Sequence, residues 1–424
     1  MKKTAVIMLI LSIMILPYSP CQAAAFVRKS KNSTKIVICA MVMEALGKIA
    51  DPRAKKLLLE GLKSKEFFIR AYAAQSLAAL KDKTVIPELK KLINDKHYLV
   101  RVSVAKALLG LGDASAEKSL FDFINDADPM IRAAVVPKLD KFGVKFVPAL
   151  LELLAKEKDP FIRAKIIEQF DDKELPPSPG PEGLGPAIDP RLAAIYNAMQ
   201  DKDWQIRQGA CIAIIQFDDP KVIPALTERL GDESVYVRAT AKETLSKLGD
   251  TSAAKVFRQD LDNKNPILKI SSFSALANLK DLNVIPVLLK ETVAPNNSTI
   301  VRREAARALA KLKPYVYKML DDSLARSKLQ DVISSNNLKV NYKVNGKDLA
   351  VIFLEALRNP KDPLYADSPF ILAELKEEMA WPALRQALFS KDLDLVSTIV
   401  FVLGDLKDKD AVEDLIKAGR KYRF

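Results

Sequence analysis

The chain is poor in several residue types that particular classes of protein require. His97 is the single histidine among 424 residues, which excludes a metal site built from several imidazoles. Three cysteines are too few for a disulfide framework. Glycine is scarce, with 14 residues, and aromatic residues make up 7% of the chain. Because Ala, Leu, Lys and Asp dominate instead, the composition predicts a helical protein without a β-rich block.

Long apolar runs are also missing, except at the N-terminus. Lysines near the start precede an uncharged apolar stretch from Ala5 to Leu16, and residues 23–25 are small enough for cleavage after Ala23 or Ala25. This pattern is typical of an export signal. We therefore expect residues 1–25 to be a signal peptide and the mature protein to be periplasmic, in a bacterial envelope. The alternative is a protein anchored through a lipid on Cys21.

An arginine recurs along the chain, at a step of 31 residues from Arg70 to Arg163 and again from Arg207 to Lys269. An apolar residue precedes each arginine directly, and a large apolar residue follows seven positions later. Self-similarity at this period predicts a solenoid of stacked helical pairs rather than one globular core. The arginine set comprises Arg70, Arg101, Arg132, Arg163, Arg207, Arg238 and Arg302, with Lys269 in register. The apolar residues seven positions later are Leu77, Leu108, Leu139, Phe170, Ile214, Leu245 and Leu276.

Each unit has start and stop signals for its second helix. Asp128-Pro129 and Asp159-Pro160 provide a capping side chain followed by proline at the first helical position. Glycines just past the apolar stripe suit a helix C-terminus, and aspartates follow them in the turn to the next unit. In the unit of Arg238 we expect the buried stripe to consist of Val237, Ala241, Leu245 and Leu248. The glycines are Gly112, Gly143 and Gly249, and the aspartates are Asp51, Asp82, Asp113, Asp219, Asp250 and Asp281.

The motifs Ile-Pro-x-Leu, Val-Arg-x-x-Ala and Leu-Gly-Asp resemble HEAT repeats, in particular the short bacterial variety of the phycobilin-lyase type. The resemblance implies an all-α fold, a right-handed α-solenoid of about 11–12 helix pairs. It is clear over residues 35–313 and weaker beyond, where Tyr365 and Val396 keep the register. A small hairpin around Asn345-Gly346 is expected in the irregular stretch.

The expected organisation follows from these repeats and their interruptions. A segment rich in proline and glycine inserts 13 residues between Arg163 and Arg207, as a loop or as a hinge between half-solenoids. The predicted divisions are a signal peptide at 1–25, N-terminal repeats at 26–172, the inserted loop at 173–190, central repeats at 191–313, an irregular or degenerate repeat at 314–348 and divergent C-terminal repeats at 349–424.

No residue pattern predicts catalysis, a cofactor or a metal. We interpret the arginine set as a structural ladder, with Asp128 or a turn aspartate as the partner of Arg132, because a cation in the first turn of a helix needs an acidic neighbour. His97 is expected to be a solvated turn residue, and Cys39 and Cys211 buried free thiols. HEAT-type enzymes that hydroxylate a modified lysine need several His-Glu pairs, which this chain lacks.

The resemblance to HEAT repeats also implies that the second helices line a concave face. We predict binding there through Tyr72, Lys106, Lys141, Lys165, Lys247, Arg307, Lys311 and Phe370. That face lacks the dense basic and aromatic residues of a nucleic-acid channel, so no nucleic acid is expected. The predicted function is a non-catalytic scaffold for a protein or peptide partner. Two alternatives stay open. One is a tetrapyrrole lyase-like or chaperone activity. The other is binding of anionic envelope polymers or lipids, because the 66 Lys and Arg residues outnumber the 53 Asp and Glu residues. The oligomeric state is also open.

Overall fold

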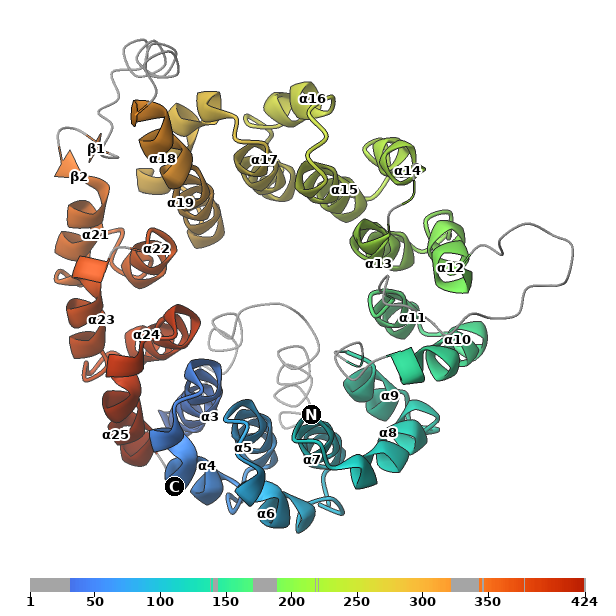
Figure 1. Cartoon of the computed structure of the whole chain (residues 1–424). Helices are drawn as coiled ribbons and strands as arrows, with labels where there is room; N and C mark the ends of the chain where they lie inside the picture. Colours follow the sequence, from blue (N-terminus) through green and yellow to red (C-terminus); the bar gives the residue numbers. More distant parts are fainter. Residues whose placement is uncertain are drawn as a thin grey trace, which may run out of the picture. The chain divides into compact units, whose positions relative to one another are not determined.

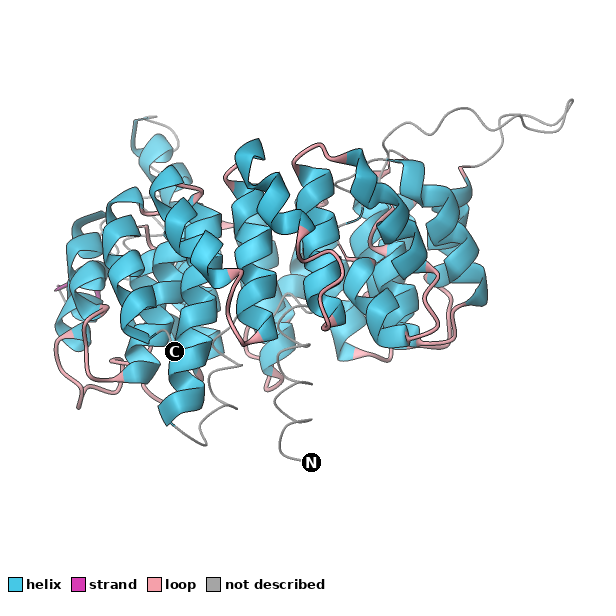
Figure 2. Cartoon of the chain, turned by 90° about the horizontal axis from the view of Figure 1, so that it is seen from below, coloured by secondary structure: helices cyan, strands magenta, loops and turns pink. Residues whose placement is uncertain are grey.

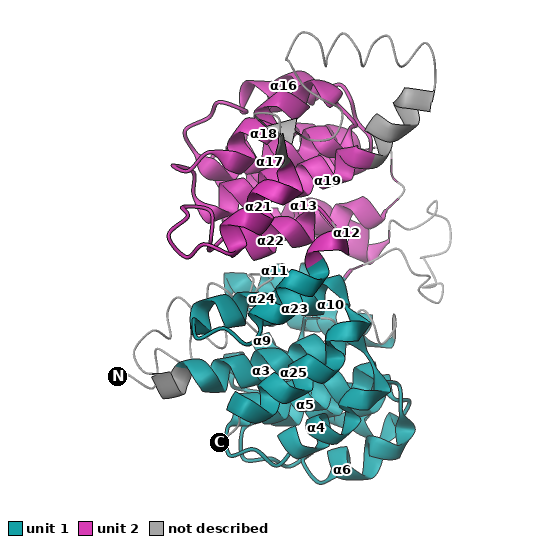
Figure 3. Cartoon of the chain, turned by 90° about the vertical axis from the view of Figure 1, so that its left-hand side faces the viewer, with its two compact units in different colours: residues 1–169, 381–424 teal, residues 170–380 magenta. Residues whose placement is uncertain are grey.

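A computed structural model describes residues 31–137, 139, 144–170, 189–217, 219, 221–321, 343–344, 347–376 and 378–422. The described residues are nearly all helical, and short loops join the helices (Figure 2). The chain divides into two compact units (Figure 3): unit 1 holds residues 1–169 and 381–424, and unit 2 holds residues 170–380. Among the described helices, none is both long enough and apolar enough to cross a bilayer.

Unit 1 is built from pairs in which a first helix packs against a second helix. Within this unit the second helices form the layer on the concave side (Figure 1). Its first helices are α4 (Lys55–Gly61), α6 (Ile86–Lys90), α8 (Glu117–Ile124), α10 (Val147–Lys156), α23 (Trp381–Ala387) and α25 (Val412–Tyr422). Its second helices are α3 (Lys31–Ile49), α5 (Phe67–Ala79), α7 (Tyr98–Gly110), α9 (Pro129–Val135), α11 (Pro160–Ile167) and α24 (Leu393–Leu406).

Unit 2 repeats the same two-layer arrangement (Figure 1). Its first helices are α12 (Pro190–Ala198), α14 (Val222–Arg229), α16 (Ala254–Gln259), α18 (Ile285–Val293) and α21 (Leu349–Leu357). Its second helices are α13 (Trp204–Ala213), α15 (Val235–Lys247), α17 (Pro266–Asn278), α19 (Thr299–Asp321) and α22 (Ser368–Glu374). Short 3-10 turns precede many helices: η1 (Pro52–Ala54), η2 (Lys83–Val85), η3 (Ala114–Ala116), η5 (Val144–Phe146), η7 (Leu282–Val284), η8 (Glu378–Ala380) and η9 (Lys409–Ala411), while η6 (Ile214–Gln216) follows α13.

The predicted apolar stripe forms the core between the two layers. All seven residues that follow the arginine positions, from Leu77 to Leu276, have at most 1% of their surface exposed. Leu248 is an exception to the predicted stripe, since it is 37% exposed. It is the C-cap residue of α15, where the helix ends and the neighbouring layer no longer covers it. The buried stripe in the repeat of Arg238 therefore ends at Leu245.

A residue with left-handed backbone geometry ends the second helices at one repeated position. Gly112 and Gly249 occupy it with φ of 87° and 78°, as glycine at a helix C-terminus does readily. Lysine or alanine takes the same position elsewhere, and the spacing of 31 residues is kept in the weak C-terminal units. These residues are Ala50, Lys81, Lys280, Lys376 and Lys407. Gly143 lies outside the described residues.

The stretch from 314 to 348 differs in part from the expected irregular repeat. Helix α19 continues through residue 313 to Asp321, so the helical lattice extends further than expected. The predicted hairpin is present: β1 (Lys343–Val344) pairs antiparallel with β2 (Lys347–Asp348), with Val344 opposite Lys347. The proline-rich insertion expected at 173–190 lies outside the described residues except for Asp189 and Pro190, which begin α12.

The described helices include a pair whose two members come from opposite ends of the chain. Helix α25, from the C-terminus, packs as a first helix against α3, from the N-terminus, and α24 packs beside α3 as the preceding second helix. We call α25 and α3 the composite repeat. With this pair counted, the described helices form eleven pairs, within the predicted range.

Candidate protein-binding face

Four of the ladder arginines tie their own repeat to the next one. Arg207 in α13 donates from Nε and Nη2 to the two carboxylate oxygens of Asp232, each at 2.8 Å. Its Nη1 donates to the carbonyl oxygens of Asp201 and Lys202, at 2.8 and 3.0 Å. Burial of Asp232 opposes its ionisation, but the hydrogen bond from Arg207 holds the carboxyl pKa below 3.8. The arginine thus closes the turn before its own helix and binds the turn of the following repeat.

Three other arginines have the same arrangement. Arg70 binds Asp95, at 2.9 and 2.8 Å, and Arg132 binds Glu157, at 2.8 Å. Both also donate to carbonyl oxygens five and six residues back. Arg302 pairs with Asp367 across the irregular stretch. The hydrogen bond from Arg132 to Glu157 raises the pKa of the arginine.

Arg132 was expected to pair with Asp128 or a turn aspartate, and this expectation is wrong, because its ion pair is with Glu157. Asp128 accepts the backbone N–H of Met130 at 2.9 Å and therefore caps α9 instead of pairing with the arginine. Asp159 and Asp203 cap their helices in the same way. A short aspartate at the N-cap is held by the helix N–H groups, so the arginine reaches forward to the next repeat for its carboxylate.

Arg101 and Arg238 form a weaker version of the ladder. Arg101 donates to the carbonyl oxygen of Asp95 at 3.1 Å. Arg238 donates to the carbonyl oxygens of Asp232 and Glu233, at 2.6 and 3.0 Å. Arg163 is half-buried in α11.

The concave face carries a second set of cross-links, between side chains of neighbouring second helices. Polar groups bridge one helix to the next at hydrogen-bond distance, so the face is stiffened by the residues it displays. In unit 1 the bridges are Gln75 to Ser103 at 2.9 Å, Lys106 to the carbonyl oxygen of Pro137 at 2.7 Å, and Lys48 to Asp405 at 2.8 Å. In unit 2 they are Gln208 to Thr240 at 3.1 Å, Asn278 to Ser246 at 2.9 Å, Lys311 to Asn278 at 3.0 Å and Arg307 to Glu374 at 2.5 Å.

The described basic residues predicted for this face are engaged locally. Lys106 donates to the last carbonyl groups around α9, and Lys165 pairs with Glu168 at 2.6 Å. Arg307 pairs with Glu304 and Glu374. Because each guanidinium or ammonium group already has acceptors, the positions do not form a basic stripe.

Lys247 and Lys311 are the more accessible members of the predicted set. Lys247 is half exposed and pairs with Glu243 at 2.8 Å on the same helix. Lys311 is exposed and donates to Ser274 at 3.2 Å. Exposed polar pairs of this kind open readily to solvent, because their net contribution to stability is small. These two positions of the set are the ones open to a ligand.

The two aromatic residues predicted for the binding face are less exposed than expected for residues that contact a ligand. Phe370 is 5% exposed and lies under the guanidinium of Arg303, whose carbon is 4.7 Å from the ring centroid. Tyr72 is half-buried, and burial raises the pKa of its hydroxyl. Phe370 is therefore a packing residue. Lys141 lies outside the described residues.

Ile212 is one of the exposed apolar residues on the second helices of unit 2, along with Tyr236 of α15 and Ile300 of α19. It extends from α13 with 42% of its surface exposed, next to the bridge between Gln208 and Thr240. Its position five residues after Arg207 is one that the repeat pattern places on the concave side. The bridging amides and hydroxyls were less apparent in the sequence, because their partners lie a full repeat away.

His97 and the two described cysteines have structural roles. His97 is half-buried rather than solvated: its ring stacks on Phe67 with centroids 3.6 Å apart, and Nδ1 accepts the N–H of Leu99. Burial lowers the pKa of its imidazole. Cys39 and Cys211 are free and buried, as expected. Within the described part of the chain, no three potential ligands among His, Cys, Asp and Glu gather around one point.

The fold and the ladder define a class, an α-solenoid of short helical pairs in which most second helices carry a ladder arginine. The HEAT-repeat sequence profile matches residues 30–108, 86–170 and 192–277, which together cover more than half of the chain. The chain therefore belongs to the HEAT-repeat family. No curated protein matches it significantly.

Several solved structures are similar to the chain at low sequence identity and low TM-score. They include human deoxyhypusine hydroxylase in complex with glycerol, at 18% identity over 66% of this chain and 97% of that one, with a TM-score of 0.29. The CpcE and CpcF complex of phycocyanin lyase from Nostoc sp. is 17% identical over 66% of this chain and 94% of that one, with a TM-score of 0.32. The Kap95:Nup1 complex matches at 12% identity over 94% of this chain and 69% of that one, with a TM-score of 0.39. These likenesses concern the fold alone.

Proposed function

We propose that the protein is an exported, non-catalytic scaffold that binds a protein partner along the face of its second helices. The local pairing of charges on that face is the observation that supports a protein partner most directly. Lys165, Lys247 and Arg307 each have a carboxylate neighbour, so a ligand recognised by negative charge alone would compete with existing pairs. A folded partner offers donors, acceptors and apolar atoms together, which this mixed face can match.

Ile212 is the anchor position in this proposal. An exposed apolar side chain among hydrogen-bonding neighbours suits the centre of a contact patch, where removal of apolar surface from water stabilises the complex. Repeats on either side contribute further weak contacts. Because the repeats interact only with their neighbours, small rotations between them adapt the face to its partner.

Export rests on the N-terminal pattern of basic residues, apolar stretch and small residues. In this proposal the partner is a component of the bacterial envelope. Mass determination of the protein recovered from a periplasmic fraction tests this part. A mature chain beginning at residue 24 or 26 supports it, and a full-length chain in the cytoplasm contradicts it.

A photo-crosslinking amino acid at position 212 tests the binding face in intact cells. Ile223 in α14 is the matched control, because it is also an isoleucine with 42% exposure but belongs to a first helix. We expect position 212 to capture a defined protein and position 223 to capture none. Equal capture at both positions, or capture at 223 alone, contradicts binding through the second helices.

A further inference from the structure

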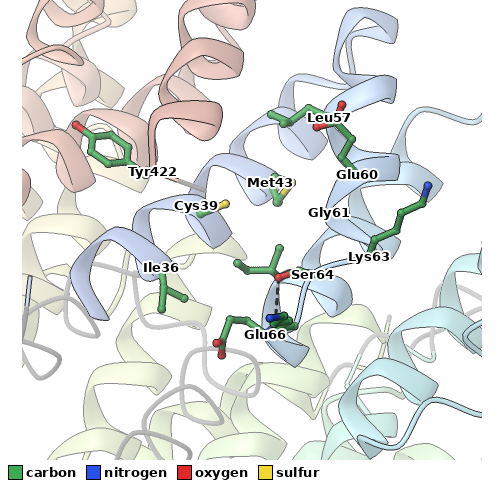
Figure 4. A pocket seen from close by; sticks show the side chains of 12 residues that line it. Ile36, Cys39, Met43, Leu57, Glu60, Gly61, Lys63, Ser64, Glu66 and Tyr422 are labelled. Carbon is green, nitrogen blue, oxygen red and sulfur yellow. Dashed lines mark hydrogen bonds between the residues drawn. The ribbon is translucent and has the colours of Figure 1, made fainter. Parts of the chain in front are cut away.

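A cavity adjoins the composite repeat at the position where the ladder is interrupted. Cys39 of α3 occupies the slot that arginine fills in most repeats, and Ser64 occupies the slot of the carboxylate that such an arginine binds. Both side chains are much shorter than the arginine and aspartate of the complete ladder. The space between α3, α4, the turn before α5 and the end of α25 is left as a cavity of about 290 Å³ (Figure 4).

The walls of this cavity are mainly apolar. Ile36 and Met43 line it from α3, Leu57 from α4, Ile69 from α5 and Tyr422 from α25. Its volume exceeds the roughly 150 Å³ of an engineered apolar cavity that binds benzene. A short alkyl chain or a single ring therefore fits the space.

The polar groups near the cavity include a serine, two lysines and two carboxylates. Inside, the hydroxyl of Ser64 accepts the N–H of Glu66 at 3.2 Å, and its carbonyl oxygen accepts from Arg70 at 2.8 Å, so both already have donors. At the edge, Lys63 and Lys65 are exposed, and neither forms an ion pair with a described residue. The two carboxylates of the lining, from Glu60 and Glu66, are half-buried. A charged group at the mouth therefore meets the lysines first.

We propose that this cavity binds a small amphiphile, with an alkyl chain inside and a carboxylate or phosphate head at Lys63 and Lys65. Apolar burial supplies the affinity and the ammonium groups supply the preference for an anionic head. Because Tyr422 comes from the C-terminal helix and Cys39 from the N-terminal helix, the site is complete only when the composite repeat is formed. A bound ligand then stabilises the joined ends by mass action.

The probes are octanoate, octanol and octylammonium, used below their micelle-forming concentrations. Comparing them distinguishes the contribution of the alkyl chain to binding from that of the head group. Cys39 reports occupancy through its alkylation rate, read by peptide mass mapping of the full-length protein. Cys39 is 2% exposed but lines the cavity, whereas Cys211, the internal control, has no exposed surface and does not line it. Burial also raises the thiol pKa of Cys211 to about 12. With octanoate at ten times its dissociation constant, alkylation of Cys39 should slow about tenfold, since only the unliganded form reacts. Octanol should protect less, and octylammonium least.

Two variants assign the effects to the cavity. In the double variant Lys63→Gln, Lys65→Gln, octanoate should protect Cys39 from alkylation no more than octanol does. The protection by octanol should stay as in the wild type. Cys39→Leu fills the cavity and should abolish the rise in melting temperature that octanoate causes in the wild-type protein.

The proposal is overturned if no octyl probe slows alkylation or raises the melting temperature, or if Cys39→Leu responds as the wild type does. Equal protection by all three probes overturns the assignment of the head group. Vesicles of anionic phospholipid separate the ligand sources: protection by vesicles as well as octanoate indicates a lipid chain, and protection by octanoate alone indicates a free carboxylate.

Discussion

Lys48 in α3 donates a hydrogen bond of 2.8 Å to Asp405 in α24, 357 residues further along the chain. This bridge has the same form as those between consecutive second helices, such as Gln75 to Ser103. Arg53 adds a bond of 2.8 Å to the carbonyl oxygen of Lys409. The two ends of the chain are thus joined by the contacts that join neighbouring repeats elsewhere.

The close approach of α24 to α3 depends on a glycine. A Cβ on Gly404 would lie 2.8 Å from both Cα and Cβ of Ala45, which is closer than packed atoms allow. Gly404→Ala should therefore lower the free energy of unfolding by about 1–3 kcal/mol, as overpacking does. Thermal and denaturant unfolding measure the loss.

Gly231→Ala is the control for that variant. The nearest atom to a Cβ at Gly231 is the carbonyl oxygen of Glu228, at 3.6 Å, which is ordinary contact. This substitution should be neutral or stabilise by up to about 1 kcal/mol. Equal destabilisation by the two alanines would show that Gly404 has no special packing role.

Leu245 and Leu248 test where the buried stripe ends. Leu245→Ala removes a side chain with no exposed surface and should cost about 2–5 kcal/mol. Leu248→Ala removes one that is 37% exposed and should cost less than about 1 kcal/mol. Denaturant unfolding of the two variants checks the difference. A larger loss from Leu248→Ala would mean that the register of α15 is shifted.

Arg207 and Arg238 test the value of the carboxylate in the ladder. Arg207→Ala leaves Asp232 buried without its main partner and should cost about 3–5 kcal/mol. Arg238→Ala removes bonds to two carbonyl oxygens only and should cost about 1–2 kcal/mol. Similar losses from both substitutions, measured by unfolding at neutral pH, would contradict the role of the Arg207–Asp232 pair.

Acid should weaken the same pair. Burial of Asp232 favours its neutral form, but the hydrogen bonds from Arg207 and the Ser234 N–H hold its folded pKa below the ordinary 3.8. The stability from this carboxylate is therefore present above pH 3.8 and is lost as the pH falls through the folded pKa. Wild-type unfolding free energy should fall more steeply below about pH 4 than that of Asp232→Asn. Parallel curves would show that Asp232 does not contribute.

The positions of the repeats could be predicted from the sequence because each repeat carries the same residue pattern. The arginine slot, the apolar residue seven later and the turn aspartate coincide in unit after unit, so an ambiguous position is resolved by its neighbours. Leu248 was misassigned because periodicity continues past the point where the helix is covered. The predicted hairpin was readable because Asn345-Gly346 is a strong local turn signal.

The partners of these residues were harder to predict. The carboxylate that binds a ladder arginine lies in the next repeat and varies between Asp232 and Glu157, so no local motif marks it. The basic residues of the concave face were expected to be available, but they have acceptors close by on their own helix, as Lys247 has in Glu243, or on an adjacent helix, as Arg307 has in Glu374. The composite repeat has no signal in the order of the sequence, because its two helices are separated by nearly the whole chain.

A designed disulfide tests the junction of the two chain ends most directly. A Cβ on Gly419 would lie 3.8 Å from the Cβ of Val42, which matches the mean separation of about 3.8 Å in disulfides. Val42→Cys combined with Gly419→Cys, with the native cysteines replaced, should form an intramolecular bond under mild oxidation. Peptide mapping and migration on a non-reducing denaturing gel identify it, with Val42→Cys alone as the control. We predict a monomeric chain crosslinked between residues 42 and 419. Free thiols, or crosslinks between molecules only, would contradict a repeat built from both ends of the chain.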